Sequence, residues 1–225
     1  MHDLNSEKAT TNKAKSASTK KARFGDDIDL EKYEHATAEL PYLDDLSGIP
    51  LDAKHQMLQT GVTVGDTNHR SGTIIQMDHS VIHCVSKQTD IEVMSTKKAL
   101  EKYDWLSSYM WKAVAVDSDK YTAHVELSPG NGYFIRALPG SKSVYPVQAC
   151  LYIGKKNLAQ SVHNIIIAEE GSELHIITGC TTAPRDEPAM HLVTMALGIM
   201  WWTMRSRQWA MISSGVNCAP ERSVT

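Results

Sequence analysis

The sequence predicts an α+β protein in which an N-terminal helical region is followed by a region of short β-strands. Helical signals, such as capping residues and apolar side chains at helical spacing, gather in the first half of the 225 residues. From Lys120 onward, short runs of β-branched and apolar residues alternate with turn residues such as SPGNG, LPGSK and EEGSE. This spacing indicates a sandwich, a barrel or a stacked β-solenoid, and periodicity alone does not choose among them.

The chain divides into four predicted parts. The first part, residues 1–25, is rich in Lys, Ser, Thr and Ala and has almost no large apolar side chain, so we expect a disordered tail. Residues 26–115 are predicted to form an N-terminal mixed helical region. Residues 116–191 carry most of the strand-like runs, and residues 192–225 form an atypical C-terminal tail.

Local signals place the elements of the second part. Pro41 and SGIP break the first acidic stretch into short helical pieces, and Gly61 closes a short helix over LDAKHQMLQTG. The β-branched run SGTIIQMDHSVIHCVSKQTDIEVMS indicates strands. Ser95 is a predicted N-cap for a helix over STKKALEKYDWLSSYMWKAV. Five further runs are predicted to be strands, namely YTAHVEL, GYFIRAL, VQACLYI, SVHNIIIA and ELHIIT.

Composition argues against several classes of protein. A net charge of −3 at pH 7 gives no general attraction to nucleic acid or to an anionic membrane. The opening residues lack the apolar segment of a secretory signal, and the longest apolar run, LVTMALGIMWWTM, is shorter than the ~20 residues that a spanning helix needs. We therefore expect a cytoplasmic protein that binds neither nucleic acid nor membrane.

The four cysteines are far apart and form no CxxC pair, which argues against a disulfide framework and a zinc ribbon. Cys180 ends the strand-like run ELHIITGC, where a thiol is often accessible, although an isolated cysteine is more often a buried small side chain. His175 lies five positions earlier, and this odd offset puts the two side chains on opposite faces of a straight strand. Only a bulge or a positive φ at Gly179 would bring them together as a metal pair.

The other histidines have weaker claims to a function. His79 and His83 are four residues apart in a strand-like run, where such a spacing separates side chains by ~13 Å. His124 and His163 each fall within a predicted strand. We expect all four to be structural or surface histidines.

Four longer stretches stand out together. They are RSGTIIQMDHSVIHCVSK, EKYDWLSSYMWKAVAVDSDKYTAHVEL, GYFIRALPG and AQSVHNIIIAEEGSELHIITGCTTAP. These stretches resemble the SufB/SufD family of iron–sulfur cluster assembly scaffolds, particularly its archaeal-type members. The likeness runs from about Asp26 to His191, and HIITGCTTAP followed by a short loop and a histidine is similar to the family's IEGCTAP…LH signature.

The resemblance implies a fold, partners and a site. It selects the solenoid, so that residues 116–191 would form a partial right-handed parallel β-helix after the N-terminal helical region. It implies a transient iron–sulfur cluster, built with a SufC-type ATPase, a second SufB/SufD-type subunit and a sulfur donor protein. Cys180 matches the cysteine that receives sulfur as a persulfide. His191, which closes the same motif, and His175 are supporting candidates for cluster assembly.

The composition changes after His191. Half of the ten methionines and three of the five tryptophans fall between Met190 and Met211. Members of the resembling family are far longer and continue with alternating strands, so the sequence predicts a truncated or frameshifted product after about residue 191. A solenoid that stops after a few coils exposes a strand edge, and marginal stability is the expected consequence.

Three functions remain open at this point. The first is a scaffold component of the Suf system, which is not an enzyme. The second is a nonfunctional truncated remnant, and the third is an independent cysteine-dependent enzyme that uses Cys180. Such an enzyme needs a histidine base and a third orienting group, and no spacing in the sequence nominates them. We expect the scaffold function, because it follows from the resemblance.

Overall fold

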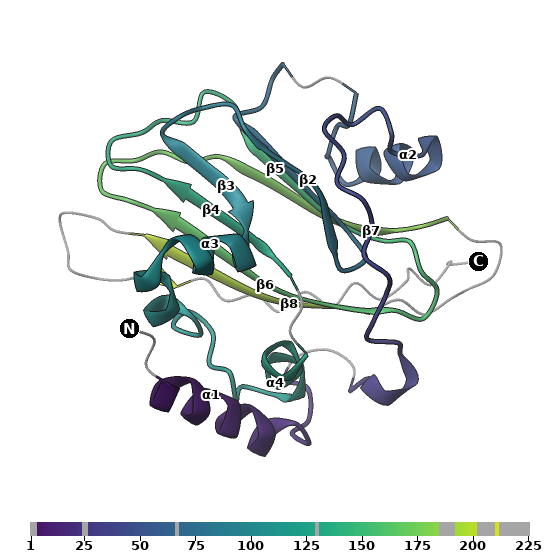
Figure 1. The fold of residues 1–225 in the computed structure, drawn as a ribbon, viewed down its shortest axis with the longest axis vertical. Coiled ribbons are helices and arrows are strands. Elements are labelled where there is room, and N and C mark those ends of the chain that lie inside the picture. The colour runs from purple at the N-terminus through teal and green to yellow at the C-terminus, as the bar shows by residue number, and fades with distance from the viewer. Residues whose placement is uncertain are drawn as a thin grey trace.

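The strands of the protein form two layers with helices outside them (Figure 1). The computed structural model describes residues 4–23, 27–65, 68–128, 131–184, 192–201 and 210–211. Its helices are α1 (Leu4–Ala17), η1 (Leu30–Lys32), α2 (Leu51–Gln59), α3 (Thr96–Lys102), η2 (Asp104–Tyr109) and α4 (Lys120–Leu127). Its strands are β1 (Gly72–Met77), β2 (Ser80–Ser86), β3 (Ile91–Ser95), β4 (Tyr133–Ala137), β5 (Val147–Ile153), β6 (Ala159–Ala168), β7 (Ile176–Thr182), β8 (Leu192–Trp201) and β9 (Ala210–Met211).

Each of the two layers is a mixed sheet. The first sheet has the strand order β2-β1-β5-β7, and the second has the order β3-β4-β6-β8-β9. From β4 to β8 the chain alternates between the sheets, and β1/β5, β5/β7, β4/β6 and β6/β8 pair in parallel. The pairs β1/β2, β3/β4 and β8/β9 are antiparallel.

The main core lies between the two sheets. Ile74 and Leu151 of the first sheet and Ile135 and Ile166 of the second belong to the same buried cluster, and none of them is more than 5% exposed. Because residues i and i+2 of a strand point to the same face, the inward residues of both sheets meet in this layer. Removal of their apolar surface from water is the dominant stabilising contribution.

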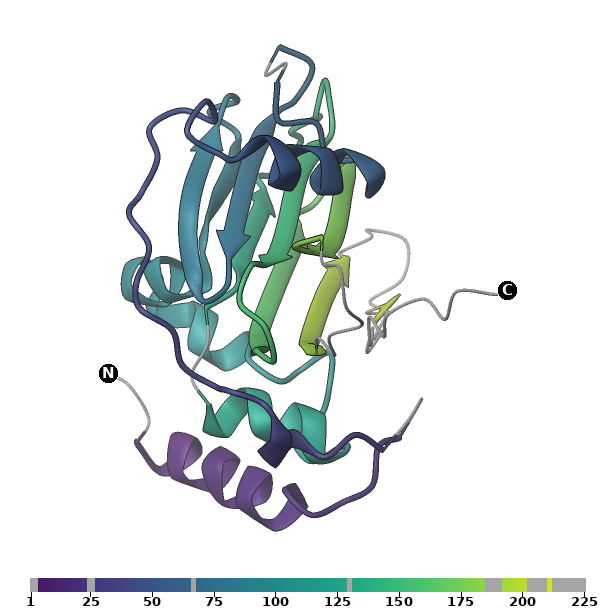
Figure 2. The ribbon, with the colours of Figure 1, turned by 90° about the vertical axis from the view of Figure 1, so that its right-hand side faces the viewer.

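Helices cover the outer faces of the sheets. On the first sheet, Met57 of α2 packs with Ile75 in a second cluster, and on the second sheet Leu106 of η2 packs with Phe134 in a third. Figure 2 shows α2 lying across the strands, and α1 and α4 below them. Two predicted helix ends are confirmed, since Ser95 caps α3 by accepting from Lys98 N, and Gly61 after α2 has a φ of 83°.

The partial right-handed parallel β-helix expected over residues 116–191 is wrong. Both sheets are mixed and open, and neither closes into a coil. The first antiparallel pair has a local cause, because only Asp78 and His79 connect β1 to β2 and Met77 faces Ser80 across the hairpin. A two-residue connection joins antiparallel strands, whereas parallel strands need a longer crossover. The broader α+β class agrees with the structure.

Two local expectations also differ from the structure. The region 26–115 is not mainly helical, because its β-branched run forms β1, β2 and β3, and β1 is a central strand of the first sheet. The run YTAHVEL, expected as a strand, forms α4. Asp119 begins this helix with a capping box, since its side chain accepts from Tyr121 N and Thr122 N while the Thr122 hydroxyl lies 3.2 Å from Asp119 N.

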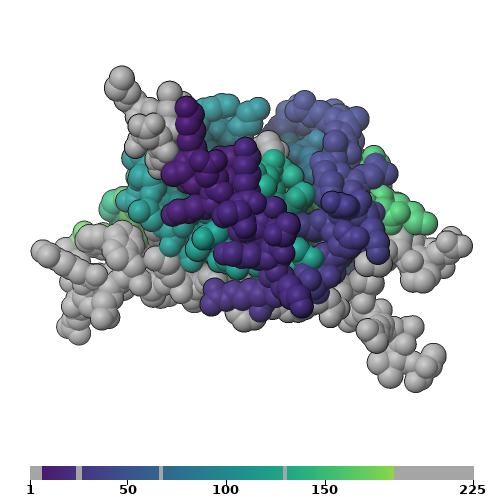
Figure 3. Space-filling model, turned by 90° about the horizontal axis from the view of Figure 1, so that it is seen from below, coloured from purple at the N-terminus to yellow at the C-terminus, as the bar shows by residue number. Residues whose placement is uncertain are grey.

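The N-terminal segment contains a helix where disorder was expected. In α1, Ala14 and Ala17 are fully buried against Val116 and against Ala123 of α4. Figure 3 shows α1 lying across this face of the molecule. Small side chains let the two helices approach closely, so packing is achieved without the large apolar residues on which the expectation of disorder was based.

Candidate functional site

Cys180 lies within strand β7 and faces the space between the two sheets. Its residue pairs with Leu151 of β5, and its side chain packs against the inter-sheet core together with Ile176. Ile177, on the opposite face, packs with the cluster beneath α2. Cys180 is partly buried, and Thr178 on the same face is exposed. Among the described strands β7 is the last of its sheet, so the thiol lies on the edge strand.

Gly179 explains why the cysteine faces inward. A Cβ atom at Gly179 would lie 2.3 Å from Thr60 Oγ1 and 2.7 Å from Thr60 Cβ. Any side chain at this position would therefore clash with Thr60, which follows the C-terminal end of α2. The parallel register continues through Gly179 without a bulge, and this residue has no positive φ. Gly179 is therefore a close-packing residue within the strand, and Cys180 takes the alternate, inward position.

Tyr133 of β4 reaches the same space from the second sheet. It is 1% exposed, and its hydroxyl lies 3.2 Å from Thr178 Oγ1. The pKa of Tyr133 is raised to about 12, chiefly by burial, with the hydrogen bond to Thr178 acting against the rise and the nearby Cys180 adding to it. At neutral pH the phenol is therefore protonated and offers a hydrogen-bond donor close to Cys180.

The structure does not bring His175 together with Cys180. His175 is exposed just before β7, where its Nε2 lies 3.1 Å from Glu173 Oε1 and its backbone N–H donates to Ser143 Oγ. The predicted separation of His175 and Cys180 onto opposite faces is confirmed. His191 lies outside the described residues.

The other two described cysteines are poor nucleophiles. Burial raises the pKa of both Cys84 and Cys150 to about 12. Cys84 also donates through its thiol to Val93 O at 3.3 Å, and Cys150 is only 1% exposed. Since the thiolate is the reactive form of cysteine, neither of these residues is suited to sulfur chemistry at neutral pH.

The described residues contain no group of three or more His, Cys, Asp or Glu side chains that could hold a metal ion. What the arrangement offers is one thiol at a sheet edge, with a protonated phenol and an exposed hydroxyl beside it. Sequence reasoning missed Tyr133 and Thr178, although Thr178 is two positions from Cys180 and so on its face.

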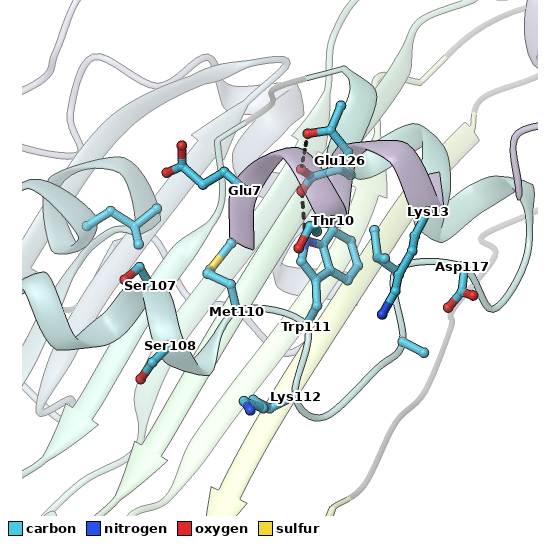
Figure 4. A pocket seen from close by; sticks show the side chains of 14 residues that line it. Glu7, Thr10, Lys13, Ser107, Ser108, Met110, Trp111, Lys112, Asp117 and Glu126 are labelled. Atoms are coloured by element: carbon cyan, nitrogen blue, oxygen red, sulfur yellow. Dashed lines mark hydrogen bonds between the residues drawn. The ribbon is translucent and has the colours of Figure 1, made fainter. Parts of the chain in front are cut away.

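A separate cavity of about 750 Å³ opens between α1 and the segment that leads from η2 to α4 (Figure 4). Trp111 points into it, and its Nε1 donates to Glu126 Oε2 at 2.7 Å, while Thr11 Oγ1 donates to Glu126 Oε1. Trp111 has a φ of 59°, an uncommon conformation for a bulky residue. The described lining contains neither cysteine nor histidine, so this cavity is not an extension of the Cys180 site.

Comparison with known proteins identifies the family of the chain. No family model matches it. It is 46% identical over 188 residues to an iron–sulfur cluster assembly SufBD family protein of Methanothermobacter thermautotrophicus strain Winter, covering 81% of this chain and 46% of that protein. It is 48% identical over 131 residues to a SufBD family protein of Archaeoglobus fulgidus, covering 58% of this chain and 35% of that protein. The chain belongs to the SufBD family.

Membership of the SufBD family confirms the resemblance found in the sequence. The chain spans about half the length of the first curated relative, 46%. The predicted truncation or frame change after about residue 191 is not supported, and β8 pairs with β6 over its whole length, from Leu192 to Trp201. Among the described helices, none combines the length and the apolar character that crossing a bilayer requires.

Proposed function

We propose that this SufBD chain takes part in iron–sulfur cluster assembly as a scaffold component, in the cytoplasm, without catalytic turnover of its own. The observation that carries the proposal is the 46% identity, over 188 residues, to a relative named for iron–sulfur cluster assembly. We further propose a SufC-type ATPase, a second SufB/SufD-type subunit and a sulfur donor protein as its partners. The transient cluster is the cargo that these proteins build and pass on.

Cys180 is the proposed point at which sulfur enters. Its thiolate attacks the outer sulfur of a persulfide on the donor, so that a new S–S bond forms on Cys180. The S–S bond of the donor breaks at the same time, and the donor leaves as a thiolate. No external oxidant or reductant is needed, because the outer sulfur moves between thiols by exchange.

Three structural observations support Cys180 in this role. Cys84 and Cys150 have thiol pKa values of about 12 because they are buried. Cys180 lies on an edge strand with the exposed Thr178 beside it, so a donor can approach the edge. The Tyr133 hydroxyl, protonated at neutral pH, is placed to donate a hydrogen bond to an anionic sulfur. By contrast, His175 faces away and supplies no base for an independent cysteine-dependent enzyme.

Sulfur loading of Cys180 is testable by mass spectrometry. The chain is incubated without oxygen with a persulfide donor, and peptides are then mapped for the addition of one sulfur atom. We expect the addition at Cys180 and its loss in Cys180→Ala, whereas the control Cys84→Ala keeps it. Equal loading of wild type and Cys180→Ala, with the sulfur on another cysteine, would overturn the assignment.

A further inference from the structure

Residues 35–39 form a strap that is fastened to the rest of the molecule mainly at its two ends. Before the strap, Glu34 N donates to Asn157 O at 2.7 Å, and after it Leu40 N donates to Ser80 Oγ at 2.9 Å. Between these contacts, none of residues 35–39 makes a backbone hydrogen bond to another described residue. Most of the strap is also exposed, and a segment of this kind opens locally at low cost in free energy.

The strap forms one wall of a cavity of about 360 Å³ that three histidines line. His35 belongs to the strap, His79 to the turn between β1 and β2, and His124 to α4. The rings of His35 and His124 are 4.6 Å apart between centroids. The described lining of the cavity contains no Asp, Glu, Lys or Arg side chain. The cavity thus gathers three side chains that can become positive, with no carboxylate in its described wall.

Two of these imidazoles have a shielded nitrogen without a partner. Among the described residues, His79 Nε2 and His124 Nε2 are buried and make no hydrogen bond. Burial lowers the pKa of His79 and lowers that of His124 to about 4, so both rings are uncharged at neutral pH. A proton on either ring would put a charge where no partner is placed for it, whereas water would hydrate that charge once the strap opened.

Two titratable groups act directly on these imidazoles, with opposite effects. The Asp78 carboxylate favours a proton on His79, and its Oδ1 accepts from Gly154 N at 2.7 Å. His35 opposes protonation of both His79 and His124, because its own ring can carry a like charge. Neither of these two groups favours a charge on His124.

The charged groups of the surrounding elements are engaged elsewhere. Strand β6 lines the cavity with the uncharged residues Ala159 and Ser161, and its His163 packs against Trp111. Glu39, in the last position of the strap, is exposed. Three further charged side chains nearby have partners, namely Glu34 with Lys155, Lys120 with Asp27, and Glu126 with Trp111.

We propose that residues 35–39 are an acid-released strap, which leaves the cavity when His79 and His124 take up protons. The pKa of His124 is about 4 with the strap closed and returns toward 6.5 when water reaches the ring. Between these values the open form binds a proton that the closed form does not. The open population therefore rises as the pH falls from 6.5 toward 4, and above 6.5 it does not depend on His124.

Cleavage by a glutamyl endopeptidase, which cuts after glutamate, measures the opening. The whole chain is digested near pH 7.5 and near pH 5, and the cleavage rates after Glu34 and Glu39 are read by mass spectrometry. Each rate is divided by that of a free peptide of residues 30–44, which corrects for the pH dependence of the protease. We expect this ratio to rise at the lower pH by up to about thirtyfold, and by less if water already reaches His124 in the closed form.

Three variants and one internal control separate strap release from other effects of acid. Glutamine carries no charge, so His79→Gln and His124→Gln should each lose part of the rise. His55→Gln makes the same change on the exposed face of α2 and should keep it all. Cleavage after Glu101, within α3, should stay slow near pH 5, because it needs wider unfolding.

The proposal is independent of the function assigned to Cys180. It is overturned if the ratio is the same at both pH values in the wild type, or if both cavity variants keep the full rise. A parallel rise of cleavage after Glu101 would also overturn it, because acid would then unfold the chain as a whole.

Discussion

Cys180 and His163 show how strongly the chemistry of one side chain depends on the face to which it points. Cys180 faces inward on the edge strand of its described sheet and is partly buried, as is Cys84, whereas Cys150 is buried. Burial raises the pKa of both Cys84 and Cys150 to about 12. The ring of His163 in β6 packs against Trp111 at a tilt of 50°, with 4.3 Å between ring centroids, and its Nδ1 is buried without a partner among the described residues. Burial keeps His163 uncharged at neutral pH.

The neutral state of His163 predicts a pH dependence of stability. Burial lowers its pKa from 6.5 to about 4, so between these values the unfolded chain binds a proton that the folded chain does not. Stability should therefore fall as the pH drops from 6.5 toward 4, by at most about 3 kcal/mol from this residue, and should not depend on it above 6.5. Urea unfolding across this range should show a shallower decline in His163→Gln than in His55→Gln. Identical pH slopes would contradict the effect.

Between elements, the contact of α2 with β7 sets the geometry of the candidate site. The end of α2 at Thr60 lies over Gly179, and the Thr60 hydroxyl donates to Met57 O at 2.8 Å, so it is not free to move aside without losing a bond. This contact holds one face of β7 against the helix. The opposite face, with Thr178 and Cys180, is thereby directed toward Tyr133.

Gly179→Ala should disturb this contact. The new Cβ would overlap Thr60, and overpacking of this kind costs about 1–3 kcal/mol of unfolding free energy. Denaturant unfolding measures the loss. Gly65→Ala is the matched control, because a Cβ there meets no atom within 4 Å, and it should leave stability nearly unchanged. Equal stability of the two variants would show that α2 and β7 are not packed in this way.

For single helices and strands, the predictions that rested on short local sequence patterns were confirmed. The helix cap at Ser95, the close of α2 at Gly61 and the strand-like runs that form β4 to β7 follow from short patterns. The run YTAHVEL was misassigned because its β-branched residues outweighed the capping box that Asp119 forms with Thr122, the second residue of the run. The helix α1 was not predicted because it packs through alanine side chains, which add little to the hydrophobicity of the segment.

For the whole molecule, the arrangement of strands was beyond the reach of periodicity. Period-2 alternation places Cys180 and His175 on opposite faces, and the structure agrees. Alternation within one strand does not predict that Tyr133 lies near the Cys180 face of β7. That contact depends on how the two sheets pack, and it joins Tyr133 to Thr178, which are 45 residues apart in the sequence. The prediction of a β-helix was wrong for a similar reason. It rested on the family resemblance, whereas the connections between strands make each sheet mixed.

The central claim is that this SufBD chain handles iron–sulfur clusters through Cys180. The most direct test is anaerobic reconstitution with iron and sulfide, followed by visible absorption spectroscopy of wild type, Cys180→Ala and Cys84→Ala. We predict cluster absorption in the wild type and in Cys84→Ala, and its loss in Cys180→Ala. The same cluster in Cys180→Ala, or no cluster in any of the three proteins, would contradict the claim.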